Sequence, residues 1–190
     1  MTTPTALLRG DRVRLTALHL ADGPAMAAWD QDSQFLRLYD TRPARPRSET
    51  ELSDWLKGRR DDPNSVIFGI RRIDEEVLLG TVELDGILWA HGVCGLGVAI
   101  GERTNWGKGY GREAAQLALA FAFHEFNLYR VTATVFAYNQ RSIHLVERLG
   151  FRREGAFREF IDRDGQRHDM LLYGLLRPEW DVRRSEQPGD

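Results

Sequence analysis

The sequence predicts a single α/β domain, in which about four helices pack around a mixed, mostly antiparallel sheet of about seven strands. Short runs rich in β-branched and aromatic residues alternate with longer segments whose apolar residues recur at helical spacing. A glycine-rich turn joins one of these runs to the longest helical segment. Of the 190 residues, 42% are hydrophobic, which is enough for one core. We expect the domain to span residues 9–180, with polar ends at 1–8 and 181–190.

The first half of the chain predicts one strand followed by two helices. Apolar residues alternate with polar ones over 13–17, as in a half-buried strand, and helical spacing follows over 22–30. A second helix is expected from Ser48, because Ser48 and Glu51 can form a capping box ahead of an apolar run. The Asp-Pro-Asn sequence at 62–64 then ends this helix.

The remainder of the chain predicts an antiparallel meander, two units of helix and strand, and a final hairpin. Gly150 is expected to end the last helix. The expected strands are 66–72, 77–84, 93–100, 131–136, 152–162 and 167–176, and the expected helices are 112–126 and 140–149.

Charge and cysteine content exclude several classes of function. The chain carries 26 Lys and Arg against 28 Asp and Glu, a formal net charge of −2, so a nucleic-acid binder with a strongly positive face is disfavoured. The single cysteine, Cys94, excludes an intrachain disulfide and any metal site built from two or more thiolates. The histidines show no ligand spacing with partner carboxylates, so we expect no metal.

The sequence predicts a cytoplasmic protein with no membrane partner. Its first residues lack the charged start and apolar stretch of a secretory signal. The most apolar stretch, 114–126, is interrupted by Gln116, His124 and Glu125, and it is shorter than the roughly 20 residues needed to cross a bilayer.

A glycine-rich turn, Trp106-Gly107-Lys108-Gly109-Tyr110-Gly111, separates the strand at 93–100 from the next helix. Its glycines allow positive φ and a close approach of the backbone to a ligand. The first turn of the helix presents free N–H groups and the positive end of the helix dipole, which suit a phosphate. Lys108 and Arg112 add positive charge. An ordinary glycine-rich loop with solvated basic residues is the alternative on the glycines alone.

Two nucleotide-binding motifs can be compared with this turn. A Walker P-loop needs Gly-Lys followed by Ser or Thr, whereas Gly109 follows Lys108, so ATP or GTP binding is disfavoured. A dinucleotide fingerprint is formally met by Gly109, Gly111 and Ala114. The next strand ends at 135–138 without an acidic residue to hold a ribose, which leaves a nicotinamide-dependent oxidoreductase only as an alternative.

A series of short motifs continues from this turn toward the C-terminus. They are GKGYGREA at 107–114, LYRV at 128–131, NQRS at 139–142, LGF at 149–151, EG at 154–155 and GQRHD at 165–169. In this order they resemble the Gcn5-related N-acetyltransferase (GNAT) family, and most closely its branch of ribosomal-protein alanine/serine N-terminal acetyltransferases. The resemblance spans about residues 9–180 and is densest from Gly95 to Tyr173.

The resemblance implies acetyl-CoA as cosubstrate, lying where the central strand splays from its neighbour. Its pantetheine arm would pair with the backbone of 98–100, and an amide near Ile100 would stabilise the oxyanion. Its diphosphate would meet the amides of 108–112, although the family pattern begins with Arg or Gln where this chain has Trp106. Asn139 would cap the next helix and contact the pantetheine. The implied cofactor-binding residues are Val98, Ala99, Ile100, Trp106, Gly107, Lys108, Gly109, Tyr110, Gly111, Arg112, Asn139 and Ser142.

The reaction that the resemblance implies is attack of a neutral amine on the thioester carbonyl, followed by loss of the thiolate. Many relatives have a tyrosine as general acid where this chain has Val146. Ser142 is the candidate acid, with Tyr138 and a water molecule as rivals. Glu83 is the candidate base, with Glu159 or a water chain as alternatives. The alternative role for Glu83 is an exposed charge on an alternating strand.

The implied partners are acetyl-CoA and an amine acceptor, and the branch favours a protein N-terminal α-amine. A small-molecule amine, such as a polyamine, an antibiotic or an amino-acid derivative, is the alternative acceptor. A non-catalytic acyl-CoA-binding module is a further alternative, because Val146 stands where relatives have tyrosine. The Arg-rich segment at 42–47 is interpreted as a solvated loop, with an acidic partner as the alternative. The oligomeric state is left open, a homodimer included.

Overall fold

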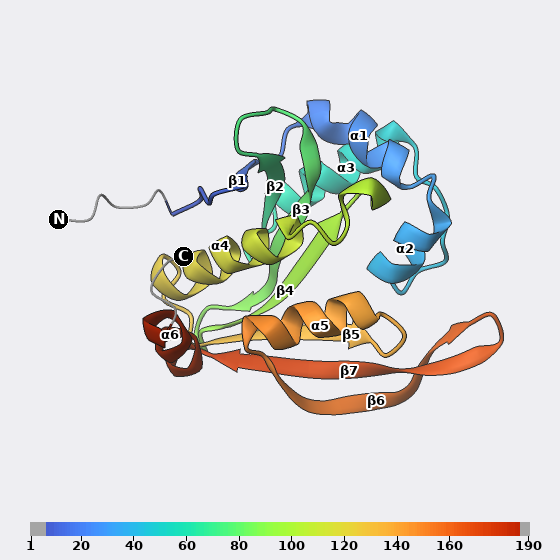
Figure 1. Cartoon of the computed structure of the whole chain (residues 1–190). Coiled ribbons are helices and arrows are strands. Elements are labelled where there is room, and N and C mark those ends of the chain that lie inside the picture. The colour runs from blue at the N-terminus through green and yellow to red at the C-terminus, as the bar shows by residue number, and fades with distance from the viewer. Residues whose placement is uncertain (1–6, 187–190) are drawn as a thin grey trace.

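The computed structural model describes residues 7–186, in which seven strands form one sheet (Figure 1). The strand order is β1-β2-β3-β4-β5-β7-β6, and all neighbouring strands are antiparallel except β4 and β5. The predicted mixed, mostly antiparallel sheet is confirmed. The strands are β1 (Val13–Ala17), β2 (Val66–Arg72), β3 (Leu78–Leu88), β4 (Val93–Ile100), β5 (Arg130–Phe136), β6 (Arg152–Arg163) and β7 (Gln166–Leu176).

The same part of the chain contains six α-helices, which corrects the expected number of about four. The additional helices are α2, which has only 7 residues, and α6, which continues past residue 180 into the predicted polar end. The rest of the predicted polar ends, at 1–6 and 187–190, lies outside the described residues. None of the helices within 7–186 is long and apolar enough to span a membrane. The helices are α1 (Gly23–Trp29), α2 (Ser33–Tyr39), α3 (Glu49–Arg60), α4 (Tyr110–His124), α5 (Gln140–Leu149) and α6 (Arg177–Glu186).

Local capping decides where several helices begin and end. The Ser48 side chain accepts a hydrogen bond from the backbone amide of Glu51, and the Glu51 carboxylate accepts one from the backbone amide of Ser48. The predicted capping box of α3 is therefore confirmed. Gly150 ends α5 with φ of 101°, as expected for a left-handed cap. Asp32 caps α2 by accepting two amides of its first turn.

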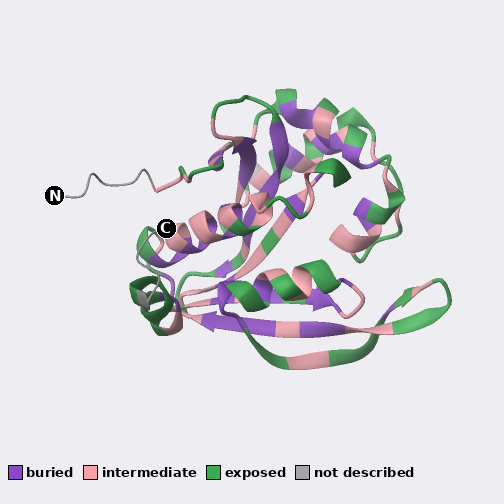
Figure 2. Ribbon diagram, in the orientation of Figure 1, coloured by how far each residue is buried: buried purple, intermediate pink, exposed green. Residues whose placement is uncertain are grey.

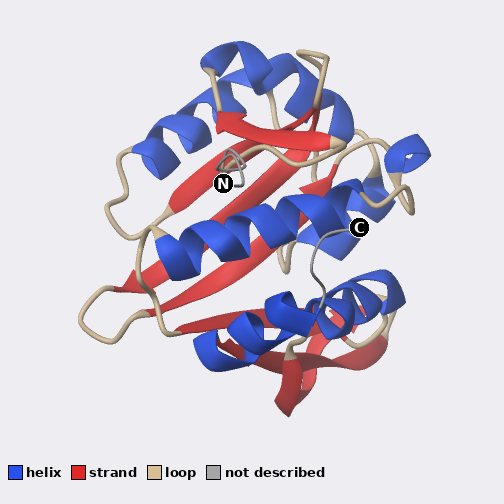
Figure 3. Cartoon of the chain, turned by 60° about the vertical axis from the view of Figure 1, so that its left-hand side comes forward, coloured by secondary structure: helices blue, strands red, loops and turns tan. Residues whose placement is uncertain are grey.

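Helix α4 joins the two halves of the core. Its Phe123 packs with residues of β5, β7 and α5, whereas its Ala118 packs with residues of β1, β2 and β3. Figure 2 shows the buried residues along the central strands and on the sheet-facing sides of the helices. Leu78 packs under α1, α2 and α3, while the adjacent Leu79 packs toward α4, so these helices cover opposite faces of the first half (Figure 3).

The sheet opens between its two parallel strands. Only three residue pairs join β4 to β5, from Val93–Arg130 to Gly95–Thr132. Beyond them β4 stays paired with β3, and β5 stays paired with β7, so the two strands run apart (Figure 1). Helices α4 and α5 follow β4 and β5, so the N-terminal ends of both helices lie at the opening.

Candidate functional site

Backbone groups of β4 face the opening. The amide of Gly101 donates to the carbonyl of Leu79 on β3 at 2.9 Å. Because such bonded positions alternate along an antiparallel pair, Val98 and Ile100 direct their N–H and C=O groups away from β3 and into the gap. Ala99 belongs to the alternate set that pairs with β3. Two of the three implied strand residues are therefore placed to pair with a ligand through their backbone.

The glycine-rich turn leads into α4 through two residues in left-handed conformation. Gly107 has φ of 74° and Gly109, the N-cap of α4, has φ of 88°, a region that favours glycine. The N-cap has no side chain to accept the first helical amides. The backbone amides of Tyr110, Gly111 and Arg112 have no hydrogen-bond acceptor among the described residues. These donors and the helix dipole together form a nest for a phosphate.

Two arginines that the sequence did not single out stand beside this nest. Arg12 donates from Nη1 to the carbonyl of Lys108 at 3.0 Å. Arg141, in the first turn of α5, places its guanidinium carbon 4.9 Å from the ring centroid of Trp106, in a cation–π contact. The indole N–H of Trp106 donates to the carbonyl of Ile100 at 2.7 Å. Trp106 therefore anchors the turn to β4 and holds a cation next to it.

Helix α5 begins on the other side of the opening. Asn139 is its N-cap and accepts the amide of Ser142 on Oδ1 at 3.2 Å, which confirms the predicted cap. The Ser142 side chain is half-buried, and its hydroxyl has no hydrogen-bond partner among residues 7–186. This hydroxyl is therefore available to a ligand.

Helix α2 bridges the two sides of the opening. Its N-cap, Asp32, forms an ion pair with Arg103 in the connection between β4 and α4. At the other end of α2, the backbone carbonyl of Arg37 accepts a hydrogen bond from the Tyr138 hydroxyl at 2.7 Å. The carbonyl of Leu38 accepts one from the side-chain amide of Asn139 at 3.4 Å. The bond to Arg37 also engages the proton of Tyr138, one of the two rivals of Ser142 as the acid.

Glu83 is buried, so its alternative role as an exposed charge is wrong. It lies on β3 opposite Gly97, beside the open part of β4, and is only 9% exposed. Its carboxylate accepts from the Ser65 hydroxyl at 3.0 Å and pairs with Arg59 of α3 at 2.8 Å. Burial raises the pKa of this carboxyl, while Arg59 and Ser65 act in the opposite direction. A buried carboxylate of raised pKa is suited to accept a proton from an amine.

The second candidate base has different surroundings. Glu159 lies at an irregularity of β6 with φ of 52°, and its amide donates to Asp169 at 2.9 Å. Its side chain is exposed. Val146 is buried in α5, where it contributes packing and no proton. The structure therefore places Glu83, and not Glu159, in buried surroundings beside β4.

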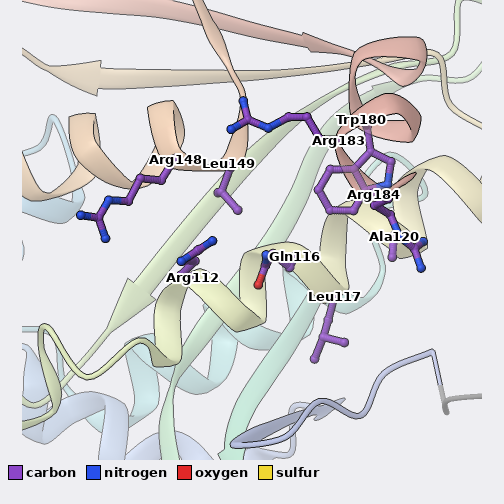
Figure 4. A pocket seen from close by; sticks show the side chains of 9 residues that line it. All are labelled: Arg112, Gln116, Leu117, Ala120, Arg148, Leu149, Trp180, Arg183 and Arg184. Atoms are coloured by element: carbon purple, nitrogen blue, oxygen red, sulfur yellow. The ribbon is translucent and has the colours of Figure 1, made fainter. Parts of the chain in front are cut away.

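A cavity of about 260 Å³ lies between α4, α5 and α6, and Figure 4 shows the side chains around it. Arginines from all three helices line it: Arg112, Arg148, Arg183 and Arg184. Positive charge thus continues from the nest at the start of α4 along one side of the molecule. This cavity was not expected from the sequence, because α6, which forms one side of it, was not predicted.

Comparison with known families identifies the family of the chain. Residues 12–152, more than half of the chain, match the family described as acetyltransferase (GNAT) domain. The chain belongs to the GNAT acetyltransferase family. As a GNAT enzyme it is an acetyl-CoA-dependent N-acetyltransferase, and the nicotinamide alternative is wrong. Within residues 7–186 of this GNAT chain, no group of three or more His, Cys, Asp or Glu side chains could hold a metal ion.

Other GNAT proteins match nearly the whole chain. An Escherichia coli (strain K12) protein named ribosomal protein uS5-alanine N-acetyltransferase is 27% identical over 185 residues, which cover 93% of this chain and 94% of that protein. The crystal structure of spermidine N-acetyltransferase from Vibrio cholerae, in complex with CoA and spermine, gives a TM-score of 0.80 at 23% identity, covering 88% and 97% of the two chains. A GNAT acetyltransferase from Bacillus anthracis gives 0.76 at 24% identity, covering 89% and 97%. The two structures show the shared fold.

The raised pKa of Glu83 predicts a pH dependence of stability. The folded protein holds this proton to higher pH than the unfolded chain does, so the carboxyl reduces stability as pH rises through the range just above the usual pKa of glutamate. Glu83→Gln removes that dependence. The stability of the variant relative to the wild type is expected to increase as pH rises from about 4 to 7, in urea unfolding at a series of pH values.

Glu51 provides a control of opposite sign, because its hydrogen bond with Arg45 lowers the pKa of this carboxyl to about 2. Its stabilising contribution is present above the unfolded pKa and is lost as pH falls. The relative stability of Glu51→Gln should therefore decrease over the same rise in pH. A constant difference between Glu83→Gln and the wild type would contradict the assignment of a raised pKa.

Proposed function

We propose that this GNAT enzyme acetylates the N-terminal α-amine of a protein and holds acetyl-CoA across the opening between β4 and β5. The observation that carries the proposal is the nest of free amides at the start of α4, beside backbone groups of β4 that β5 does not pair. The acceptor class is supported by the similarity to the ribosomal protein uS5-alanine N-acetyltransferase over 93% of this chain.

The residues around the opening suit the separate parts of acetyl-CoA. The amides of 110–112 bind the diphosphate, and Arg12 and Arg141 add positive charge beside it. The free backbone groups of Val98 pair with the amides of the pantetheine arm, whose course also passes Asn139. The arginines of the α4–α6 cavity supply charge for the 3′-phosphate.

Three residues serve the transfer itself. Glu83 accepts a proton from the acceptor amine, directly or through water, as the nitrogen–carbon bond forms. The amide of Ile100 donates to the developing oxyanion, while the Ile100 carbonyl remains bound to Trp106. Ser142 donates a proton to the sulfur as the carbon–sulfur bond breaks, and its oxygen regains a proton from solvent. Holding both reactants in this geometry supplies much of the rate.

Incubation with acetyl-CoA and a panel of acceptors tests the proposal. The panel contains peptides with free N-termini, the same peptides with blocked N-termini, and spermidine. We expect release of free CoA and an acetyl mass increment on the free peptides only. Turnover of spermidine alone would favour a small-molecule acceptor, and binding of acetyl-CoA without turnover would favour a non-catalytic module; both results would contradict the proposal.

Substitution at Gly111 tests the place of the cofactor. A Cβ at this position would lie 3.5 Å from Ile100 and 3.6 Å from Val98, which is ordinary contact, so alanine fits. The branched side chain of Gly111→Val extends into the space between α4 and β4. We expect its Kd for acetyl-CoA to rise about tenfold or more, roughly 1.4 kcal/mol, in titration calorimetry. Gly111→Ala is the matched control, and its Kd for acetyl-CoA should lie within a few-fold of the wild-type value. If the valine variant binds acetyl-CoA as tightly as the wild type does, the diphosphate binds elsewhere.

Substitution at Ser142 tests the general acid. Ser142→Ala keeps the backbone amide that donates a hydrogen bond to Asn139, so α5 retains its cap. We expect kcat to fall by about 10²-fold or more while the Kd for acetyl-CoA stays unchanged, because a general acid acts in the transition state. Ser142→Thr keeps a hydroxyl and should retain more of the activity. An unchanged kcat in Ser142→Ala would assign the protonation to water.

A further inference from the structure

Residues 42–47, interpreted from the sequence as a solvated loop, line a cavity of about 210 Å³ together with α2. Tyr39 of α2 forms part of one wall, and Arg42, Arg45 and Arg47 form the other. The volume is several times the roughly 30 Å³ that a water molecule occupies, so a side chain of a ligand can enter. In Figure 1 this segment connects α2 to α3.

The arginines of this cavity keep donors that their ion pairs do not use. Each arginine is paired with an acid through Nε or Nη2, and the pairs are Arg42 with Asp40, Arg45 with Glu51, and Arg47 with Asp30. The Nη1 group of Arg47 is buried and has no hydrogen-bond partner among the described residues. A buried charged donor without an acceptor is unfavourable, and a ligand that brings an acceptor to this guanidinium would relieve that cost.

The acids paired with these arginines, of which only Asp40 lines the cavity, offer no matching site for a cation. Asp40 accepts the amide of Arg42 on Oδ1 and its guanidinium on Oδ2. Asp30 is only 1% exposed. Glu51 is engaged on both oxygens, by the cap of α3 and by its arginine. Because the acceptors are used and donors are left, the cavity fits an anion and is unfavourable for a polyamine.

A chain of contacts leads from the cavity to Glu83. The ring of Trp55 lies between two guanidinium groups, with Arg47 at 5.6 Å and Arg59 at 5.7 Å from its centroid. Arg59 in turn pairs with Glu83 at 2.8 Å. Burial raises the pKa of Tyr39 to about 12, and the nearby charge of Glu83 adds to the shift. An acceptor amine at Glu83 therefore leaves the rest of the acceptor close to the three arginines.

We infer that this cavity binds a carboxylate carried by the acceptor, while the acceptor amine lies at Glu83. The substrate is an amine with an acidic group nearby: a peptide with Asp or Glu soon after its first residue, or an amino-acid derivative with a free carboxylate. Guanidinium groups recognise carboxylates through paired, charge-assisted hydrogen bonds. This inference rests on the proposed transfer to an amine at Glu83.

Matched acceptors test the inference. One series consists of amidated peptides that differ only in Asp, Asn or Lys at the second, third or fourth position. A second series compares a free amino acid with its amide, which separates the two sources of the carboxylate. We expect kcat/KM of the wild type to be about tenfold higher for the best Asp peptide than for its Asn partner, or for the amino acid than for its amide, and lowest for Lys.

Two variants assign this preference to the cavity. Arg45→Ala removes a guanidinium whose side chain is 69% exposed, so folding is retained. Arg47→Lys keeps a positive charge for Asp30 but removes Nη1. Both should reduce the acidic preference to about twofold or less, chiefly by lowering kcat/KM for the Asp peptide. Arg152→Ala is the control for loss of an exposed, ion-paired arginine. Arg152 lies at the start of β6, is 76% exposed and pairs with Glu179 of α6.

Calorimetric binding of the same peptides in the presence of CoA separates this inference from the proposed function. If no acceptor is acetylated, the proposed function fails, and the ratio of Kd values for the Asp and Asn peptides still decides the inference. Equal kcat/KM and equal Kd across Asp, Asn and Lys would overturn it. A preference for Lys or spermidine, or an acidic preference that both arginine variants retain, would overturn it as well.

Discussion

Strands β4 and β5 are joined by three residue pairs, and after Gly95 and Thr132 they separate. Backbone groups need hydrogen-bond partners, so the half-exposed open edge of β4 is paired by water or by something other than a strand. The protein supplies one partner itself, the indole N–H of Trp106 on the carbonyl of Ile100. The other groups are left to a ligand, and the free amides of α4 lie beside them. One gap in one sheet therefore brings together donors for a diphosphate and strand backbone for an amide-containing arm.

The parts of this site that the sequence predicted are local. The capping box at Ser48, the cap at Asn139 and the left-handed glycines each depend on residues within one turn, so spacing is enough to find them. Trp106 shows the limit of what such local patterns can predict. The sequence indicates only a missing side-chain donor, whereas the fold brings Arg141 over the ring. The burial of Glu83 likewise depends on the docking of α3, and contacts between distant segments leave no pattern in the spacing of residues.

The surroundings of Glu83 agree with an α-amine as acceptor. An α-amino group has a pKa of about 7.7 to 8.0, whereas a lysine-like amine has about 10.4, so deprotonation at neutral pH costs roughly 3.5 kcal/mol less for the α-amine. A single buried carboxylate is therefore a sufficient base for the first and a weaker one for the second. Arg59 opposes the rise that burial causes in the pKa of Glu83.

Helix α2 connects the arginine-lined cavity to the opening between β4 and β5. A helix of 7 residues is not stable by itself, because its end groups outnumber its internal hydrogen bonds. Its first turn is held through Asp32 by Arg103, and its last carbonyls are satisfied by Tyr138 and Asn139. The opposite side of the same helix presents Tyr39 to the arginine-lined cavity. Through Asn139, the wall that α2 contributes to this cavity is thus attached to the N-cap of α5, so α2 couples the cavity to the opening between β4 and β5.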